Sequence, residues 1–296
     1  MNFGQVITAM VTPFAQNGEI DFDATRNLIN HLIANGSDGL VIAGTTGESP
    51  TLTHEEKLQL FRLAVEEVNG RVPVIAGTGS NNTKASVELS QEAETIGVDA
   101  VMLVTPYYNK PSQEGMYQHF STIANNINLP VMLYNIPGRS AVGMTSDTII
   151  RLSQIDNIVS VKEASGDLGQ VTAIVNNTSE DFTLYTGEDN QTLPTVAVGG
   201  VGVVSVSAHI IGKEMQQMLN ALRNGDVAHA SRMHGYIVPF MNAMFQAPSP
   251  TPVKEALNQL GIPVGSVRLP LIPLNDTERA SLTLLIDEYK TQQDVG

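Results

Sequence analysis

The residue with the clearest chemical potential in this sequence is a lysine at the end of an apolar run. Lys162 follows Val159, Ser160 and Val161, and no other lysine of the chain lies inside such a strand-like pattern. A lysine side chain normally has a pKa of about 10.4, so roughly one in 2,500 is neutral at pH 7. Burial lowers that pKa and allows the amine to attack a carbonyl carbon. We therefore predict that Lys162 is a covalent catalyst that forms a Schiff base.

A purely structural lysine is the alternative, with its ammonium paired to the neighbouring carboxylate of Glu163. Successive side chains of a strand point to opposite faces, so Glu163 should point away from the side that Lys162 occupies. This alternation disfavours the ion pair and leaves Lys162 as a catalytic candidate.

Other polar groups also follow apolar runs and could act on a substrate. Tyr134 ends such a run, where its phenol could transfer protons, although a core tyrosine fits the pattern equally well. Thr45 and Thr46 lie between glycines in GTTG, a loop that could hold a carboxylate or could be a plain turn. Arg139 follows a Pro-Gly turn, which would present its guanidinium to a second carboxylate unless it is a surface arginine.

These residues share a position at the ends of short runs rich in Val and Ile, which alternate with amphipathic stretches. The pattern is typical of a parallel sheet with crossover helices. Eight such units predict an α/β fold, the (β/α)8 TIM barrel, whose active site lies at the carboxyl ends of the strands. The predicted strands are residues 6–11, 39–43, 72–76, 100–104, 130–134, 158–162, 182–186 and 203–206.

Helical patterns cover residues 23–35 and 53–68 and continue beyond the eighth strand. The later helices are expected over residues 213–224, 227–245, 252–260 and 276–291, with 246–252 (QAPSPTP) as a rigid connector. The first of them closes the barrel. We predict a catalytic barrel over residues 1–225 and a C-terminal helical bundle over 226–296.

Composition restricts the partners of the protein. Its 296 residues are 42% hydrophobic and 16% charged, and the formal net charge is −14, which disfavours nucleic acid and anionic membranes. There is no cysteine, and residues 1–12 do not resemble a signal peptide. No apolar run approaches the length of a membrane span. We expect a cytoplasmic enzyme with a small-molecule partner.

Several motifs in this order resemble the dihydrodipicolinate synthase family: GTTGES, VTPYYNKPSQEG, LYNIPGR, VKEASGD and, near the C-terminus, SVRLPL. The resemblance extends over essentially the whole chain. It implies condensation of pyruvate with L-aspartate 4-semialdehyde, the first committed step of diaminopimelate and lysine biosynthesis. It implies no metal and no organic cofactor, and it implies a homo-oligomer, most often a dimer of dimers.

The resemblance also implies individual roles. Lys162 matches the residue that forms the imine with pyruvate, and Tyr134 matches the proton donor and acceptor. Thr45 would connect Tyr134 to Tyr108, which reaches in from a neighbouring subunit. The residues matching the substrate carboxylate sites are Thr46, Gly187 and Val204 for pyruvate and Arg139 for the second substrate.

A site that binds lysine as an inhibitor in the family is only partly matched. Ser49, His54, Asn81 and Tyr107 agree with it, but Lys57 stands where a histidine is usual and Ala85 where a glutamate is usual. The first change adds a like charge and the second removes a carboxylate partner, so weak inhibition by lysine is expected. If Lys57 points into solvent, only the missing carboxylate matters. Tyr107 and Tyr108 could also form aromatic surface used in assembly.

Three other functions remain compatible with parts of the sequence. An N-acetylneuraminate lyase or a 2-keto-3-deoxy sugar acid aldolase would share the lysine and the tyrosine, but would have no need of Arg139. A phosphate-binding barrel isomerase could use Gly199, Gly200 and Gly202, but would leave Lys162 unexplained. A non-catalytic relative is the third alternative, and the presence of every expected reactive residue disfavours it.

Overall fold

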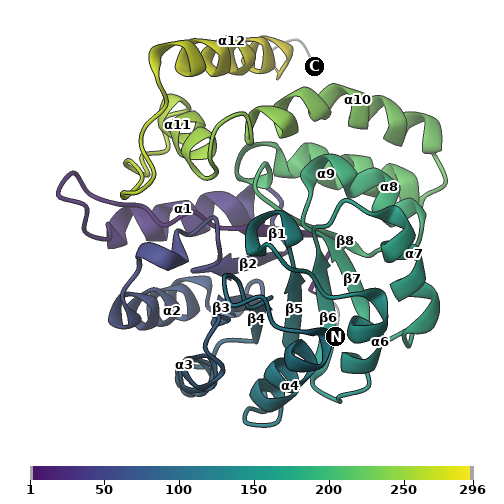
Figure 1. Ribbon diagram of the computed structural model, residues 1–296. Helices are drawn as coiled ribbons and strands as arrows, with labels where there is room; N and C mark the ends of the chain where they lie inside the picture. The colour runs from purple at the N-terminus through teal and green to yellow at the C-terminus, as the bar shows by residue number, and fades with distance from the viewer. Residues whose placement is uncertain (1–2, 294–296) are drawn as a thin grey trace.

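A closed barrel of parallel strands forms the centre of the molecule. The computed structural model describes residues 3–293, so residues 1–2 and 294–296 of the two predicted domains lie outside the described residues. Eight strands follow one another around the barrel in sequence order, and the last pairs with the first (Figure 1). The (β/α)8 prediction is confirmed. The strands are β1 (Val6–Ala9), β2 (Gly39–Ile42), β3 (Val74–Gly77), β4 (Ala100–Val104), β5 (Val131–Asn135), β6 (Ile158–Glu163), β7 (Thr183–Thr186) and β8 (Gly202–Ser205).

Helices connect successive strands and cover the outside of the barrel. Both faces of a parallel sheet must be buried, and a ring of crossover helices buries the outer one. The connecting helices are α1 (Phe22–Ala34), α2 (His54–Val68), α3 (Thr83–Ile96), α4 (Gln113–Ala124), α5 (Pro137–Ser140), α6 (Ser146–Leu152), α7 (Leu168–Asn177) and α8 (Thr192–Ala197), with short 3-10 turns at Ser49–Thr51 and Asp189–Gln191. The expected Pro-Gly turn after β5 is thus the single helical turn α5.

The first two helices begin where polar caps satisfy their free N–H groups. Asp21 accepts a hydrogen bond from the backbone of Ala24, and Thr53 and Glu56 form a reciprocal capping box at the start of α2. The predicted helices over residues 23–35 and 53–68 are therefore confirmed to within one residue at each end.

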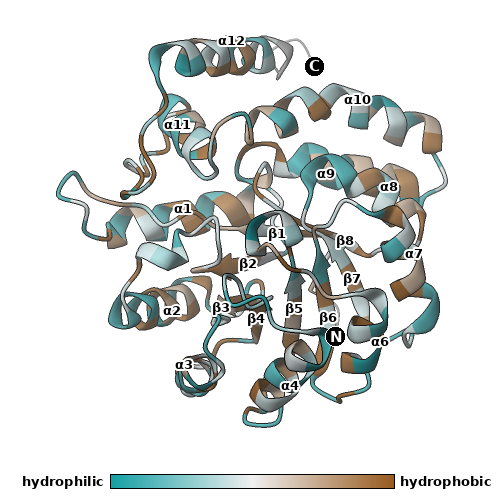
Figure 2. Ribbon diagram, in the orientation of Figure 1, coloured by the Kyte–Doolittle hydropathy of each residue, from teal (hydrophilic) through white to brown (hydrophobic). Residues whose placement is uncertain are grey.

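The apolar side chains form two cores on opposite sides of the strands. A large cluster lies between the strands and the surrounding helices, and a smaller one fills the inside of the barrel. Helices alternate between brown and teal along their length in Figure 2, as amphipathic helices do. The inner cluster includes Tyr134 and Val204, so residues predicted for the site lie inside the barrel.

The C-terminal helices pack on one side of the barrel (Figure 1). Helix α9 (Ala208–Arg223) begins five residues before the predicted start. A non-helical residue, Ile211, separates a first turn from the rest of the helix, so the helical pattern of the sequence is recognisable only after it. Helices α10 (Val227–Ala243), α11 (Thr251–Gln259) and α12 (Asp276–Gln293) follow. We call residues 227–293 the C-terminal extension. The domain boundary at residue 225 stays a prediction. No helix among residues 3–293 is long and apolar enough to cross a membrane.

Barrel closure depends on a close approach between β1 and β8. The carbonyl oxygen of Gln5 accepts a hydrogen bond from the Val203 N–H at 2.9 Å. A Cβ atom added at Gly202 would lie 2.0 Å from that same oxygen. Only glycine therefore permits this pairing, because any larger residue would displace backbone atoms.

Gly202→Ala should accordingly lower the free energy of unfolding by about 1–3 kcal/mol, the usual cost of forced overpacking. Gly235→Ala is the matched control, since the space around Gly235 in α10 is open and alanine is the better helix former. That control should gain about 0.5–1 kcal/mol. Urea unfolding of both variants checks the prediction, and equal stabilities would contradict it.

Candidate active site

Neighbouring strands place a lysine and a tyrosine at the same level inside the barrel. Tyr134 on β5 pairs in register with Lys162 on β6. The Lys162 ammonium lies 4.2 Å from the centroid of the Tyr134 ring. Both residues lie at the carboxyl ends of their strands, where the fold was expected to build its site.

The Lys162 amine is buried beside the Tyr134 ring. Its side chain is 5% exposed, and within residues 3–293 the amine makes no hydrogen bond or ion pair. Burial lowers the pKa of Lys162 to about 8, while the charges of Asp189 and Glu188 oppose the change. At that pKa about one amine in ten is neutral at pH 7, far more than for a free lysine. The group is therefore ready for nucleophilic attack near neutral pH.

The structural alternative for Lys162 fails because Glu163 points to the opposite face of β6. The Glu163 carboxylate accepts hydrogen bonds from Asn135 at 2.9 Å and from Gln170 at 3.0 Å. It also accepts the Ser165 N–H at 2.8 Å. These bonds keep Glu163 on the helix side of the barrel, as strand alternation predicts.

Gly187, predicted to bind a substrate carboxylate, lies directly against the lysine. A Cβ atom added there would be 2.8 Å from Lys162 Cε and 2.7 Å from the Cβ atom of Ala164. The Gly187 N–H already donates to the Glu163 carbonyl at 2.7 Å. That N–H is thus engaged with the protein, and the residue serves Lys162 by leaving room for its side chain.

Tyr134 keeps its phenol protonated. Burial raises the pKa of Tyr134 to about 12. The charge of Arg139 and a hydrogen bond with the Thr45 side chain lower that pKa, but by less. The loop after β2 thus brings the Thr45 hydroxyl to the Tyr134 phenol, and the relay through Thr45 stays a prediction. Thr46 beside it is buried, and Val204 lies on β8 with its side chain in the inner cluster.

A cavity of about 430 Å³ opens beside these residues. Tyr134, Thr45 and Arg139 contribute to its wall, whereas Lys162 is not among its lining residues. Arg139 is exposed on α5, and its positive charge reaches both Tyr134 and Lys162. The arrangement can therefore attract an anionic substrate from solvent towards the buried amine.

Tyr108 does not reach this centre within its own chain. Its side chain is 90% exposed, and its backbone has the left-handed φ of 70°, which is uncommon for a bulky residue. The adjacent Tyr107 lines the cavity. A tyrosine held outward in a rarely populated conformation is available to another molecule.

The six residues of the predicted lysine site are only partly assembled. Ser49, Lys57 and Tyr107 line the cavity, and Lys57 is half-buried, with its pKa lowered by burial. Lys57 therefore does not simply point into solvent. The other three do not line the cavity. His54 pairs with Glu92 at 2.6 Å, the Asn81 amide N–H donates to the Tyr107 carbonyl at 3.2 Å, and Ala85 is exposed.

Sequence reasoning missed Asp189, although it lies three residues beyond the end of β7, in the sequence TGEDN. Its carboxylate is buried and accepts hydrogen bonds from the backbone of Val206 and from both the backbone and hydroxyl of Ser207. These bonds connect the ends of β7 and β8. Asp189 also places negative charge near Lys162. Its position at a strand end was the available signal.

The glycines considered for a phosphate-binding isomerase serve packing. Gly199, Gly200 and Gly202 lie at the amino end of β8, opposite the end where Lys162 and Tyr134 converge. Added Cβ atoms would meet Val175, Thr195 and Gln5, each closer than 3 Å. No His, Asp or Glu cluster that could hold a metal ion occurs in the described part of the chain.

A barrel with these strand-end groups defines a TIM-barrel enzyme, and comparisons with known proteins identify its family. The dihydrodipicolinate synthetase family model matches residues 2–289. The chain belongs to this family and is a lyase of diaminopimelate and lysine biosynthesis.

Individual relatives are similar over nearly the full chain. A 4-hydroxy-tetrahydrodipicolinate synthase from Oceanobacillus iheyensis is 59% identical over 290 residues, covering 98% of both chains. The crystal structure of a dihydrodipicolinate synthase from Bacillus anthracis matches with a TM-score of 0.96 and 56% identity, covering 97% of this chain and 98% of that one. The chloride-inhibited enzyme from Acinetobacter baumannii, complexed with pyruvate, has a TM-score of 0.94 and 37% identity, covering 97% and 98%.

Proposed function

We propose that this chain condenses pyruvate with L-aspartate 4-semialdehyde to 4-hydroxy-tetrahydrodipicolinate, using Lys162 as the covalent catalyst. The single observation that carries the proposal is a buried amine that makes no hydrogen bond or ion pair within the described residues and lies 4.2 Å from the ring centroid of a protonated tyrosine. Pyruvate bound to the A. baumannii relative supports the choice of first substrate.

The chemistry follows from the two protonation states. The neutral Lys162 amine adds to the ketone carbon of pyruvate, and loss of water gives the imine. Loss of a methyl proton then gives an enamine, whose carbon attacks the aldehyde carbon of the second substrate. The amino group of that substrate then adds to the imine carbon, which closes the ring and expels the Lys162 amine. Because the pKa of Tyr134 is raised to about 12, its phenol begins as a proton donor for the departing water.

The two carboxylates of the substrates require separate sites. Thr46, with backbone groups at Val204 and Gly187, is proposed to hold the pyruvate carboxylate. The Gly187 N–H donates to the Glu163 carbonyl, so it can contribute to the pyruvate carboxylate site only by sharing or exchanging that hydrogen bond. Arg139 is proposed to hold the carboxylate of the aldehyde, which its exposed place on the cavity wall supports.

The relay through Tyr108 requires a second subunit. Because Tyr108 is 90% exposed here, we propose that it completes the Thr45–Tyr134 relay of a neighbouring chain in a homo-oligomer, a dimer of dimers. A cytoplasmic location is proposed with it, because the chain has no cysteine and its net charge of −14 disfavours membrane surfaces.

Lys162→Ala should fold but lose both turnover and the adduct that borohydride traps with pyruvate. The reason is that alanine has no amine, while the loss of a buried positive charge removes a desolvation cost. Mass spectrometry of peptides locates the adduct. Lys290→Ala, at an exposed lysine of α12, is the control and should trap pyruvate normally. Adduct formation on another lysine, Lys254 included, would contradict the assignment.

Activity should return when inactive Tyr108→Phe and Lys162→Ala subunits are mixed and allowed to exchange. Mixed oligomers contain sites in which one chain supplies Lys162 and its neighbour supplies Tyr108. Initial rates before and after exchange measure the effect, with each variant incubated alone as the control. Proven exchange without recovery would show that Tyr108 acts within its own chain.

L-Lysine should be a weak inhibitor. The half-buried Lys57 ammonium on the cavity wall repels a cationic ligand by about 1 kcal/mol in water and about 4 near a protein surface, at roughly 4 Å. Ala85 offers no carboxylate in compensation. Initial rates against millimolar lysine check this, and strong inhibition below millimolar concentrations would refute it. The double variant Lys57→His with Ala85→Glu should become more sensitive.

A further inference from the structure

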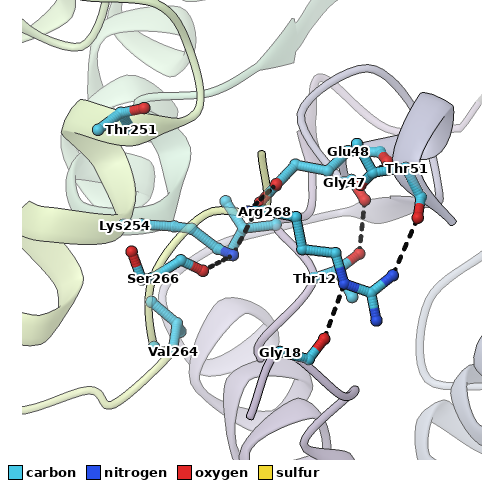
Figure 3. A network of polar contacts seen from close by, with 12 residues as sticks. Thr12, Gly18, Gly47, Glu48, Thr51, Thr251, Lys254, Val264, Ser266 and Arg268 are labelled. Atoms are coloured by element: carbon cyan, nitrogen blue, oxygen red, sulfur yellow. Dashed lines mark hydrogen bonds and ion pairs between the residues drawn. The ribbon is translucent and has the colours of Figure 1, made fainter. Parts of the chain in front are cut away.

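A second buried lysine connects the C-terminal extension to the loop after β2 (Figure 3). Lys254 on α11 is 2% exposed, and its ammonium lies 2.8 Å from Glu48 Oε1. It also donates to the Ser266 carbonyl at 2.7 Å and lies 4.2 Å from the centroid of the Phe14 ring. The other Glu48 oxygen accepts the Arg268 N–H at 2.9 Å. Two parts of the extension therefore hold one carboxylate.

Glu48 belongs to the loop that carries the site threonines. Its N–H donates to the Thr45 carbonyl at 3.0 Å, and the next N–H, of Ser49, donates to Gly44 at 3.2 Å. Glu48 itself has the left-handed φ of 58°. This conformation is costly for a residue other than glycine and persists only where surrounding contacts enforce it. The bonds to its carboxylate supply such contacts.

Arg268 binds the C-terminal end of the same loop, at Thr51. Its guanidinium donates to the Thr51 carbonyl at 3.0 Å and to the Gly18 carbonyl at 2.8 Å, and it pairs with Glu56 at the start of α2. Figure 3 shows the Arg268 side chain reaching from the C-terminal extension to Gly18 and Thr51. The loop over residues 44–51 is thus bonded to the extension at Glu48 and at Thr51.

We propose that Lys254 and Arg268 are positioning residues of the lyase reaction, which hold the loop over residues 44–51 so that Thr45 and Thr46 keep their places at the site. Neither side chain lines the cavity, so they act through Glu48 and Thr51 rather than on the substrate. The inference rests on the proposed function, because it assigns Thr45 to the Tyr134 relay and Thr46 to the pyruvate carboxylate.

The proposal predicts a particular kinetic pattern in Lys254→Met. The rate per active site, counted by borohydride trapping of pyruvate, should fall about ten- to a hundredfold, since small misplacements of catalytic groups have effects of this size. The KM for pyruvate should rise with it. The KM for the aldehyde should stay within about twofold, because Arg139 lies on α5, outside the loop over residues 44–51. A merely stabilising contact would change the number of active sites and leave these constants unchanged.

Matched variants separate positioning from loss of the fold. Removing one partner of a buried ion pair leaves an unpaired charge, so Lys254→Met is paired with the double variant Lys254→Met, Glu48→Gln. Arg268→Ala removes the partly exposed guanidinium and leaves the Lys254–Glu48 pair intact, and the same kinetic pattern is expected from it at smaller size. Lys254→Arg should restore part of the rate, and Lys290→Met, at an exposed lysine, should behave as the parent enzyme.

Hydrogen exchange gives a readout that does not depend on the proposed function. The amides of Glu48 and Ser49 should exchange at least tenfold faster in Lys254→Met or Arg268→Ala, while those of β5 and β6 should not change. Unchanged exchange in this loop, or unchanged rate per site and pyruvate KM in the folded variants, would overturn the positioning role. Failure of the parent enzyme to trap pyruvate on Lys162 would instead overturn the proposed function.

Discussion

The site depends on the desolvation of one amine. A protonated lysine loses hydration when it enters an apolar barrel, so burial lowers the pKa of Lys162 to about 8. The same environment raises the pKa of Tyr134 to about 12. One physical cause thus produces a nucleophile and a proton donor as neighbours, and the strand register holds them together. The rest of the barrel maintains the apolar surroundings on which both shifts depend.

The local parts of this arrangement could be predicted from the sequence. The strand pattern placed Lys162 and Tyr134 at strand ends, and alternation by two placed Glu163 on the other face, as its bonds to Asn135 and Gln170 confirm. These predictions succeed because a strand's periodicity fixes the direction of each side chain. The roles of Thr46, Arg139 and Val204 stay predictions, because the chain's geometry places the residues without showing what they bind.

The long-range parts could not be predicted in this way. Lys254 and Glu48 are 206 positions apart, and the helical pattern of α11 gives no sign that its lysine meets a carboxylate across the fold. Periodicity shows which residues are buried, but pairing between distant elements depends on how they pack. Tyr108 is 90% exposed, which agrees with its expected place on an assembly surface, but the sequence of one chain does not show which surface of a neighbour it would contact.

The two buried lysines show how the position of a carboxylate decides the use of an amine. Burial lowers the pKa of both to about 8, and each ammonium lies 4.2 Å from an aromatic ring. Lys254 donates directly to the Glu48 carboxylate, which stabilises the charged form of that lysine and gives it a structural role. Asp189 is the carboxylate with the largest electrostatic effect on Lys162. Its oxygens instead accept hydrogen bonds from Val206 and Ser207. Asp189 therefore contributes charge without capturing the amine, and Lys162 stays free to react.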